Sequence, residues 1–284
     1  MQRVSRQLSA VAKLGNLALS SKKSSPSRCI ASLNKSMLNK QTIGCMSIMR
    51  HASSLVQKFE DSVSALPLRE AVRYTEKNMK WSASELKGYV DSHANALIEH
   101  GFRSGEKILM YLPEGAEKHV TLLAAAKIGL HVIDIFVAQD SILSVDDMRS
   151  ILTTAAPKAF IFEPVNAVQD NLLLLRKAIP EFFYYDDTKG QHFHSKHWPS
   201  LECFIHTGFD VEMGALNYKH MFLRDPVNSA VDATASSTDD KLPVYSVVSK
   251  QGEGWSINKT ITQKDALTEW KFADQIVKQQ YFEA

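Results

Sequence analysis

The sequence predicts an α/β protein with a mostly parallel sheet that is flanked by helices on both faces. From residue 59 onward, short apolar runs of strand length alternate with longer segments of helical periodicity. Capping residues and glycines mark where these helices begin and end. Strict alternation of strand and helix indicates parallel strands, because each parallel connection has to cross back over the sheet and usually does so as a helix.

The first long helix is predicted in the segment WSASELKGYVDSHANALIEHG, residues 81–101. Ser82 and Glu85 have the spacing of a capping box at its start, and Gly101 is a natural stop at its end. Its apolar face is expected to consist of Leu86, Tyr89, Val90, Ala94 and Leu97.

Two strands and a second helix follow. The run KILMYL (107–112) predicts a buried strand, and Pro113 separates it from a helix over roughly 115–128. Three consecutive alanines, 124–126, permit close backbone packing of that helix. The run HVIDIFV (131–137) predicts the second strand.

The segment SVDDMRSILTTA (144–155) predicts a helix that is capped by Ser144. Asp146 and Asp147 fall in its first turn, where negative charge suits the helix dipole. The runs KAFIFEP (158–164) and EFFYYD (181–186) are expected to be strands on either side of a helix at 168–179.

The remainder is less regular. Residues 187–200 predict a polar loop, and an irregular region extends to about residue 240. A last helix is predicted at 262–282, with apolar positions at Leu267, Trp270, Phe272, Ile276 and Val277. Within the irregular region, His206, Thr207 and Asp210 could suggest an acid–base site. A turn after a strand is favoured instead, because Gly208, Thr207 and Asp210 suit such a turn and no nucleophile motif stands nearby.

The composition of the chain limits the classes of protein to which it can belong. The chain is 44% hydrophobic and 23% charged, which is typical of a soluble globular protein. Residues 1–52 hold nine Lys or Arg and no acidic residue, which leaves 24 basic and 31 acidic residues in the body. A net acidic surface repels phosphate backbones, so no nucleic-acid partner is expected. No apolar run approaches 18 residues, so no transmembrane span is expected either.

Residues 1–52 have the pattern of a mitochondrial presequence. They are basic, contain ten serines, and space their apolar residues as an amphipathic helix does, with a candidate cleavage point near Ala52. The alternative is a disordered basic tail on a cytosolic protein. Cys203 is the only cysteine in the body and is expected to be a small core residue, which is consistent with a reduced compartment. The prediction is therefore the mitochondrial matrix or the matrix face of the inner membrane.

Several ordered pieces of the chain resemble a known family. They are WSASEL (81–86), GFRSGEK (101–107) leading into a strand, LPE (112–114) and AKIG (126–129). In order and spacing they resemble the beginning of the adenylate-forming (AMP-binding) enzymes, in particular the medium-chain acyl-CoA synthetases. The resemblance is good over about 59–163 and thin over 164–225. It implies the fold of the first subdomain of the large domain, which is scaffold and carries none of the family's reacting groups.

The resemblance also implies where an ATP loop would stand. The family's T-S-G-T-T-G-x-P-K loop would fall close to residue 247, where this chain has VVSKQGEGWSINKTITQKD. Consecutive hydroxyls and the Pro-Lys step are missing, and Glu253 and Trp255 place a negative charge and a bulky ring in the loop. The sequence does not match a Walker A loop either, since Glu253 and Asn258 occupy its glycine positions. The loop residues that remain are Ser249, Gly252, Gly254, Lys259 and Thr260.

We therefore expect a degenerate loop and no bound cofactor. The family's adenylate motif, ribose-binding acid and lysine-bearing lid are expected to be missing from the chain. The predicted organisation is a presequence at 1–52, an acyl-CoA-synthetase-like domain at 53–240, and a C-terminal extension with a helix at 241–284 that replaces the ATP-loop region.

The spacing of three histidines suggests a metal site. His192, His194 and His197 form H-x-H-x-x-H, whose imidazoles could ligate a metal ion. No cysteine or carboxylate stands inside the group, so a solvated loop is the favoured interpretation and no metal is expected.

Together these observations favour a pseudoenzyme: a non-catalytic accessory subunit of a large mitochondrial assembly, a respiratory-chain complex or the ATP synthase above all. Its expected partners are other protein subunits, and it is expected to sit peripherally at the inner membrane. The alternatives are a remnant that binds an acyl group or a nucleotide, and one half of a split acyl-CoA ligase, that is, an acid–thiol ligase.

Overall fold

The computed structural model describes residues 54–74, 78–137, 141–186, 191–222, 239–252 and 254–269. The chain divides into two compact units, residues 1–45 and 46–284, and every described residue belongs to the second. The predicted presequence therefore lies outside the described residues. So do Trp270, Phe272, Ile276 and Val277 of the predicted last helix.

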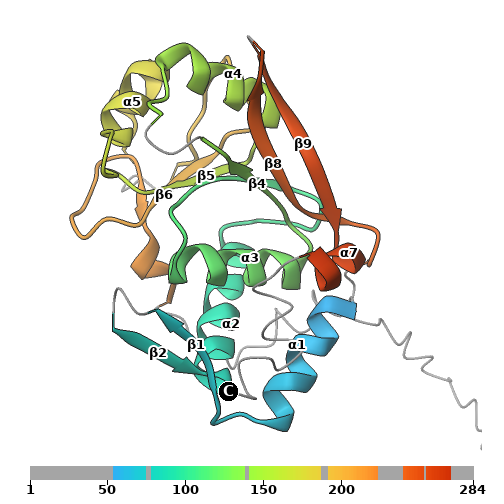
Figure 1. The fold of residues 1–284 in the computed structure, drawn as a ribbon. Coiled ribbons are helices and arrows are strands. Elements are labelled where there is room, and N and C mark those ends of the chain that lie inside the picture. Colours follow the sequence, from blue (N-terminus) through green and yellow to red (C-terminus); the bar gives the residue numbers. More distant parts are fainter. Residues whose placement is uncertain are drawn as a thin grey trace, which may run out of the picture. The chain divides into compact units, whose positions relative to one another are not determined.

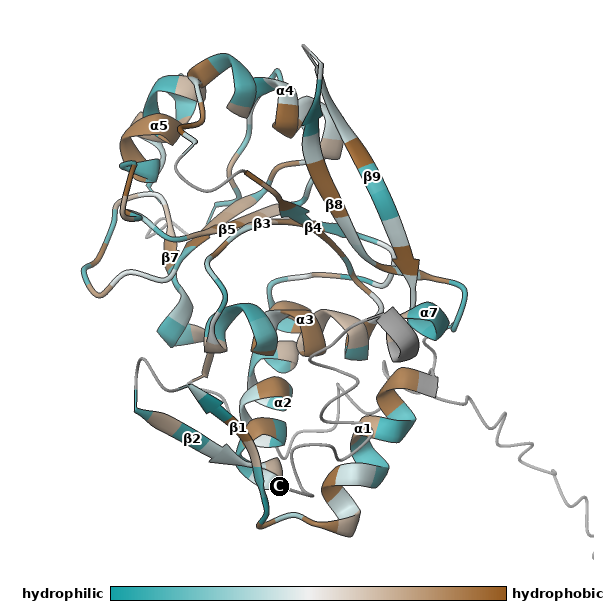
Figure 2. Cartoon of the chain, in the orientation of Figure 1, coloured by the Kyte–Doolittle hydropathy of each residue, from teal (hydrophilic) through white to brown (hydrophobic). Residues whose placement is uncertain are grey.

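The second unit is built on a seven-stranded sheet with the order β7-β6-β5-β3-β4-β8-β9 (Figure 1). Every neighbouring pair is parallel except β8 and β9, which are antiparallel, so the predicted mostly parallel sheet is confirmed. The strands are β3 (Lys107–Tyr111), β4 (His131–Ile135), β5 (Ala159–Phe162), β6 (Cys203–His206), β7 (Leu216–Asn217), β8 (Pro243–Gln251) and β9 (Gly254–Thr262). Figure 2 shows the apolar residues that run along the central strands.

Helices cover both faces of this sheet, as predicted (Figure 1). One face carries α1 (Ser54–Ala65), α2 (Ala83–Glu99), α3 (Ala116–Ile128) and α7 (Gln263–Glu269), and the other carries α4 (Val145–Ala155) and α5 (Asn171–Ala178). A separate antiparallel hairpin consists of β1 (Glu70–Tyr74) and β2 (Met79–Ser82). No helix among the described residues is both long enough and apolar enough to cross a bilayer.

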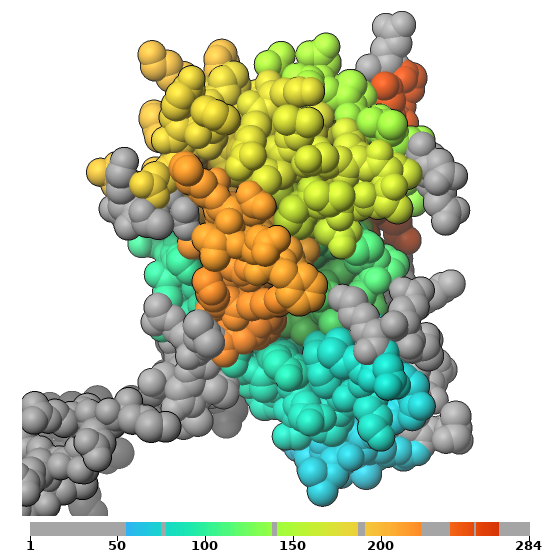
Figure 3. Space-filling view, turned by 90° about the vertical axis from the view of Figure 1, so that its left-hand side faces the viewer, coloured from blue at the N-terminus to red at the C-terminus, as the bar shows by residue number. Residues whose placement is uncertain are grey.

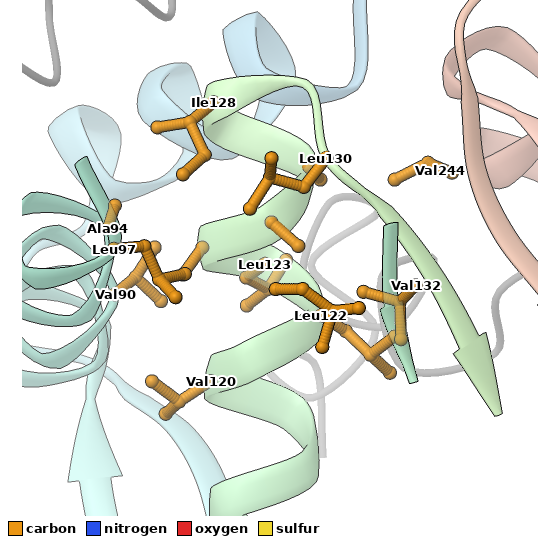
Figure 4. Packing of buried hydrophobic residues seen from close by; sticks show 14 of the residues in the cluster. Val90, Ala94, Leu97, Val120, Leu122, Leu123, Ile128, Leu130, Val132 and Val244 are labelled. Carbon is orange, nitrogen blue, oxygen red and sulfur yellow. The ribbon is translucent and has the colours of Figure 1, made fainter. Parts of the chain in front are cut away.

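The first core layer lies between the sheet and the pair α2 and α3. Figure 4 shows Val90, Ala94 and Leu97 of α2 facing α3, with Val132 on the sheet beyond it. The three alanines of α3 are buried, as their small size predicts. Tyr89 departs from the predicted apolar face: it is exposed, and its ring packs at 4.5 Å on that of Trp81 from the β1–β2 hairpin.

Local signals correctly placed both ends of α2 and the start of α4. Ser82 and Glu85 form the predicted capping box of α2, and Gly101 has a φ of +81° just beyond its end. Ser144 and Asp147 form a second capping box on α4. The next helix, α5, begins later than predicted because the Asp170 side chain accepts a hydrogen bond from the backbone N–H of Leu173 and so caps it.

The strand predicted at 181–186 is wrong. Residues Pro180–Tyr184 form a 3₁₀ helix, η1, in which Phe182 is buried while Phe183 and Tyr184 are exposed. Pro180 provides no backbone N–H and favours a helical start. The place beside β5 that this run would have filled belongs to β6. A second 3₁₀ helix, η3 (Tyr218–Phe222), follows β7 and packs on α2.

Strand β8 pairs with β4, and β9 pairs with β8. Residues 243–262 therefore lie in the same sheet as the domain predicted for 53–240.

Candidate functional site

The stretch predicted to stand in place of the ATP loop forms the β8–β9 hairpin. Ser249 pairs with Ser256 and Lys250 with Trp255 in an antiparallel ladder, and Gly252 takes a left-handed φ of +61° at the turn. A phosphate cradle needs successive backbone N–H groups that converge on one point. In a ladder these groups instead point alternately into and out of the strand pair. Glu253 lies outside the described residues.

The hairpin does not bring the remaining loop residues together. Thr260 pairs with Ser246, whereas Gly254 pairs with Gln251 at the turn. Thr260 lies six positions after Gly254 along β9, which is roughly 20 Å at about 3.3 Å per residue. The Ser246 hydroxyl bonds that of Thr260 at 2.9 Å, and Lys259 beside it is exposed. Lys259 and Thr260 therefore cannot act with the glycine turn on one phosphate group.

Asp147 of α4 binds two side chains of the β8–β9 hairpin. Its Oδ1 atom accepts hydrogen bonds from Trp255 Nε1 at 2.7 Å and from Lys250 Nζ at 3.0 Å. Burial disfavours its negative charge, but the bonds from Trp255, Ser144 and Lys250 outweigh burial and hold the pKa of Asp147 well below its usual value. An ionised carboxylate thus neutralises the lysine nearest the turn, and it would repel a phosphate at the same place.

The structure describes all three histidines of the H-x-H-x-x-H spacing and does not gather them into a metal-ligand group. His192, His194 and His197 are all exposed, while Phe193 and Ser195 between them are buried. Ser195 Oγ donates a hydrogen bond to Glu181 Oε1 at 3.1 Å. The predicted solvated loop is therefore anchored on alternate residues. Within the described parts of the chain, no group of three or more His, Cys, Asp or Glu residues is arranged to hold a metal ion.

Two further residues that the sequence singled out, His206 and Cys203, occupy positions in the sheet. His206 is the last residue of β6 and is buried, directly before the turn predicted to follow a strand. Cys203 packs against the first core layer, in agreement with the sequence, and burial raises the pKa of its thiol to about 12.

A cleft of about 470 Å³ opens at the carboxyl ends of β3, β4 and β5. In open α/β sheets this edge is where ligands bind, because the connections diverge there to opposite faces. Its polar lining consists of Tyr111, Glu114, Lys118, Asp134, Ser141, Glu163, Asn166 and Asn171. The cleft was not predicted from the sequence, since these residues are spread over three strand–helix units and form no motif. The only signal was a polar residue soon after each strand.

Lys118 stands at the centre of a charged network in this cleft. Its Nζ atom lies 2.7 Å from Glu114 Oε1 and 2.7 Å from Asp134 Oδ2. Tyr245 of β8 donates to the same Asp134 oxygen at 2.9 Å. His119 Nε2 lies 3.5 Å from the second oxygen of Glu114.

The pKa values of this network follow from burial and pairing. Burial raises the pKa of Asp134, and the neighbouring Lys118 only partly offsets it. Burial also disfavours the Lys118 charge, but Asp134 and Glu114 outweigh it and raise the pKa of Lys118. Hydrogen bonds from His119 and Lys118 lower the pKa of Glu114 to about 2 despite its partial burial. Lys118 is the one lysine among the described lining residues and is bonded to two carboxylates, an arrangement that is unsuited to holding a phosphate.

Comparison with known proteins agrees with the resemblance read from the sequence. The sequence profile of the AMP-binding enzyme family matches residues 59–200. The propionate–CoA ligase of Escherichia coli (strain K12) is 27% identical over 180 residues, and the mitochondrial medium-chain acyl-CoA ligase ACSF2 of Homo sapiens is 22% identical over 138 residues. These alignments cover 59% and 49% of this chain but only 26% and 22% of the two ligases. The chain therefore spans about a quarter of the length of the curated relatives it matches.

Solved structures show the same fold. The luciferase-like enzyme from Zophobas morio aligns with a TM-score of 0.55 at 16% identity, over 83% of this chain and 47% of that one. The Mycobacterium tuberculosis fatty acyl CoA synthetase aligns with a TM-score of 0.51 at 12% identity, over 76% and 35%. The α/β architecture matches the N-terminal subdomain of the adenylate-forming enzymes. With half of its length matched by the family profile and its sheet shared with these structures, the chain belongs to the AMP-binding enzyme family.

Proposed function

We propose that this chain is a non-catalytic accessory subunit of a large mitochondrial assembly, a respiratory-chain complex or the ATP synthase above all, built on an AMP-binding scaffold. One observation carries the proposal: the hairpin at the expected ATP loop is an antiparallel ladder whose Lys250 and Trp255 are both bonded to the ionised Asp147. The described residues of this hairpin offer a triphosphate no set of converging N–H groups, and the lysine nearest the turn, Lys250, is already paired.

Exposed apolar side chains support a protein partner. Phe183 and Tyr184 of η1 are exposed, and so are Phe209, Val211 and Met213. The two segments are neighbours, since Gly214 lies against Phe182. Figure 3 looks onto this side of the protein, where residues 203–222 lie at the surface. Large exposed apolar groups of this kind often mark a protein interface.

The mitochondrial location rests on two supports. The first is the basic, acid-free pattern of residues 1–52. The second is the similarity to ACSF2, which is described as a mitochondrial ligase.

A second candidate function is a remnant that binds an acyl group or a nucleotide, or one half of a split acyl-CoA ligase. The cleft of about 470 Å³ favours it, because that volume suits a small ligand. The carboxylates of the cleft oppose it, since fatty acids and nucleotides are themselves anionic.

The two candidates differ in their response to ligands. If the chain is non-catalytic, MgATP or octanoate is expected to leave the melting temperature of the full chain unchanged, because a ligand stabilises only a protein that binds it. Binding at a hundredfold excess over Kd would add about 2.7 kcal/mol and produce a clear shift. The matched control is the E. coli propionate–CoA ligase with MgATP and propionate. A dose-dependent shift of this chain would support the second candidate and contradict the first.

Assembly is tested separately. Mitochondria from the native source, solubilised in a mild detergent and resolved on a native gel, are expected to show this chain in a band far larger than its own 31.8 kDa. The control is the same sample treated with a denaturing detergent, in which the chain should migrate alone. A chain that migrates as a monomer in mild detergent would overturn the proposed role.

A further inference from the structure

Three oxidisable aromatic rings lie in contact where the β1–β2 hairpin packs beside α2 (Figure 1). The centroid of the Trp81 ring lies 4.5 Å from that of Tyr89 and 5.6 Å from that of Tyr74. Both separations are those of rings in direct contact. We refer to Tyr89, Trp81 and Tyr74 as the aromatic row. Among aromatic side chains, indole and phenol lose an electron most readily, so an electron vacancy can pass along this row.

The two ends of the aromatic row differ. Tyr89 is 37% exposed and gives the row an end at the surface. At the other end, the hydroxyl of Tyr74 lies 2.8 Å from Nδ1 of His119 on α3. A phenol that loses an electron becomes a strong acid and has to release its proton. A base within hydrogen-bond distance can take that proton directly, so Tyr74 has the proton acceptor that its oxidation requires.

Glu114 determines which nitrogen of His119 is available as the base. Hydrogen bonds from His119 and Lys118 lower the pKa of Glu114 to about 2, so its carboxylate is ionised and can only accept. His119 Nε2, which lies 3.5 Å from Glu114 Oε2, therefore carries a proton. In the neutral ring, Nδ1 is then the acceptor for the Tyr74 O–H group. The same carboxylate stabilises the imidazolium that forms when this proton is transferred.

We propose that Tyr74 is a site of one-electron oxidation that is reached from the surface through Tyr89 and Trp81. An oxidant of the metal-complex or peroxyl class takes one electron from the exposed end of the row, and an electron from Tyr74 fills the vacancy. In that step the O–H bond of Tyr74 breaks and its proton bonds to His119 Nδ1. The products are a neutral phenoxyl radical, an imidazolium and the reduced oxidant.

The site holds an oxidising equivalent on one phenol. Because the proton stays on the hydrogen-bonded His119, a one-electron reductant such as ascorbate restores Tyr74 when the proton returns from the imidazolium. No step in this sequence uses the proposed accessory role, so the inference holds whether or not the chain is an accessory subunit.

Flash photolysis of the full chain tests the site. A ruthenium tris-bipyridine sensitiser with a sacrificial electron acceptor generates a one-electron oxidant in solution. The wild type is expected to form a phenoxyl radical, which is detected by its sharp visible absorption and by electron paramagnetic resonance. Tyr74→Phe is expected to lose most of this signal and to leave a tryptophan radical instead.

Tyr184→Phe is the matched control, because it removes a phenol that is 83% exposed and lies outside the aromatic row. It is expected to keep most of the phenoxyl signal. If access to solvent decided which tyrosine reacts, the control would lose the signal and Tyr74→Phe would keep it, which would overturn the proposal. A wild type that forms no phenoxyl radical would overturn it as well.

Two further variants test the base and the row. In His119→Gln the amide can accept the Tyr74 hydrogen bond but cannot hold the proton, so oxidation of Tyr74 is expected to slow by roughly a hundredfold. The slowing of the wild-type reaction in D₂O is expected to change with it, which a merely structural role of His119 would not cause. Trp81→Phe keeps a ring for packing and is expected to lower the phenoxyl yield several-fold. If circular dichroism shows both variants to be folded and both react as the wild type does, the assignment is wrong.

Discussion

Replacement of Lys127 by alanine is expected to lower the free energy of unfolding by about 3 kcal/mol, because it breaks a buried ion pair from one side. Lys127 is on α3, and only 3% of its side chain is exposed. Its Nζ atom lies 2.5 Å from Glu60 of α1 and 2.6 Å from Asp91 of α2. Burial opposes the Glu60 charge, but Lys127 and Lys87 outweigh burial and lower the pKa of Glu60. The variant would therefore leave two partly buried carboxylates with too little positive charge.

Urea denaturation followed by circular dichroism measures this loss. Lys87 provides a matched control, because it bonds the same two carboxylates from a position that is 30% exposed. Lys87→Ala is expected to cost at most about 1 kcal/mol, since solvent compensates exposed charges. Equal losses in the two variants would contradict the role assigned to burial, and an unchanged Lys127→Ala would contradict the network itself.

Acidification is expected to destabilise the protein through His93 before its carboxyl groups titrate. His93 of α2 is fully buried against the rings of Tyr218 and Phe222, and neither ring nitrogen has a hydrogen-bond partner among the described residues. Burial lowers its pKa from 6.5 to about 3. Between these values the unfolded chain binds a proton that the folded chain does not, so stability falls as the pH falls. The full effect is roughly 5 kcal/mol and is reached below pH 3.

The variant His93→Phe keeps the ring packing and removes the titration. It is expected to flatten the fall in stability between pH 6.5 and pH 4, and to add about 1 kcal/mol at pH 7 because two unpaired nitrogens are lost. A residual slope should remain from His131, whose pKa burial lowers to about 4 with a contribution from Lys107. His194→Gln, at an exposed position, is the control and should keep the wild-type profile. Identical pH profiles for wild type and His93→Phe would contradict the assignment.

Local signals in the sequence were sufficient for most elements. The Ser82–Glu85 capping box correctly placed the start of α2, because a cap is a contact between residues three apart. Strands β3, β4 and β5 were predictable because continuous apolar runs are required where both faces of a parallel sheet are covered. The run at 181–186 carried the same signal and was misassigned. An apolar run can become a strand only where it has a neighbouring strand to pair with. The position beside β5 is occupied by β6.

The sequence also predicted that the ATP loop is altered, since hydroxyls and the Pro-Lys step are either present or missing in a local stretch. It could not predict that Asp147, about a hundred residues earlier, binds the lysine and the tryptophan of that stretch. The cleft could not be predicted from the sequence either. Asp134 and Asn171 meet there only because β4 and β5 lie on either side of β3, an order that no local pattern encodes.

By itself, the sequence determined the class of fold and the family resemblance, and it predicts that the family's loop chemistry is lost, because each of these depends on residues that are close together in the chain. The tertiary structure alone decided what surrounds those residues. Pairing of β8 with β9 places Ser249 and Thr260 in strands, and the Asp147 carboxylate neutralises Lys250. The acidic cleft at the sheet edge is likewise a feature of the tertiary structure. These features arise from contacts between distant segments, which burial and strand order bring together.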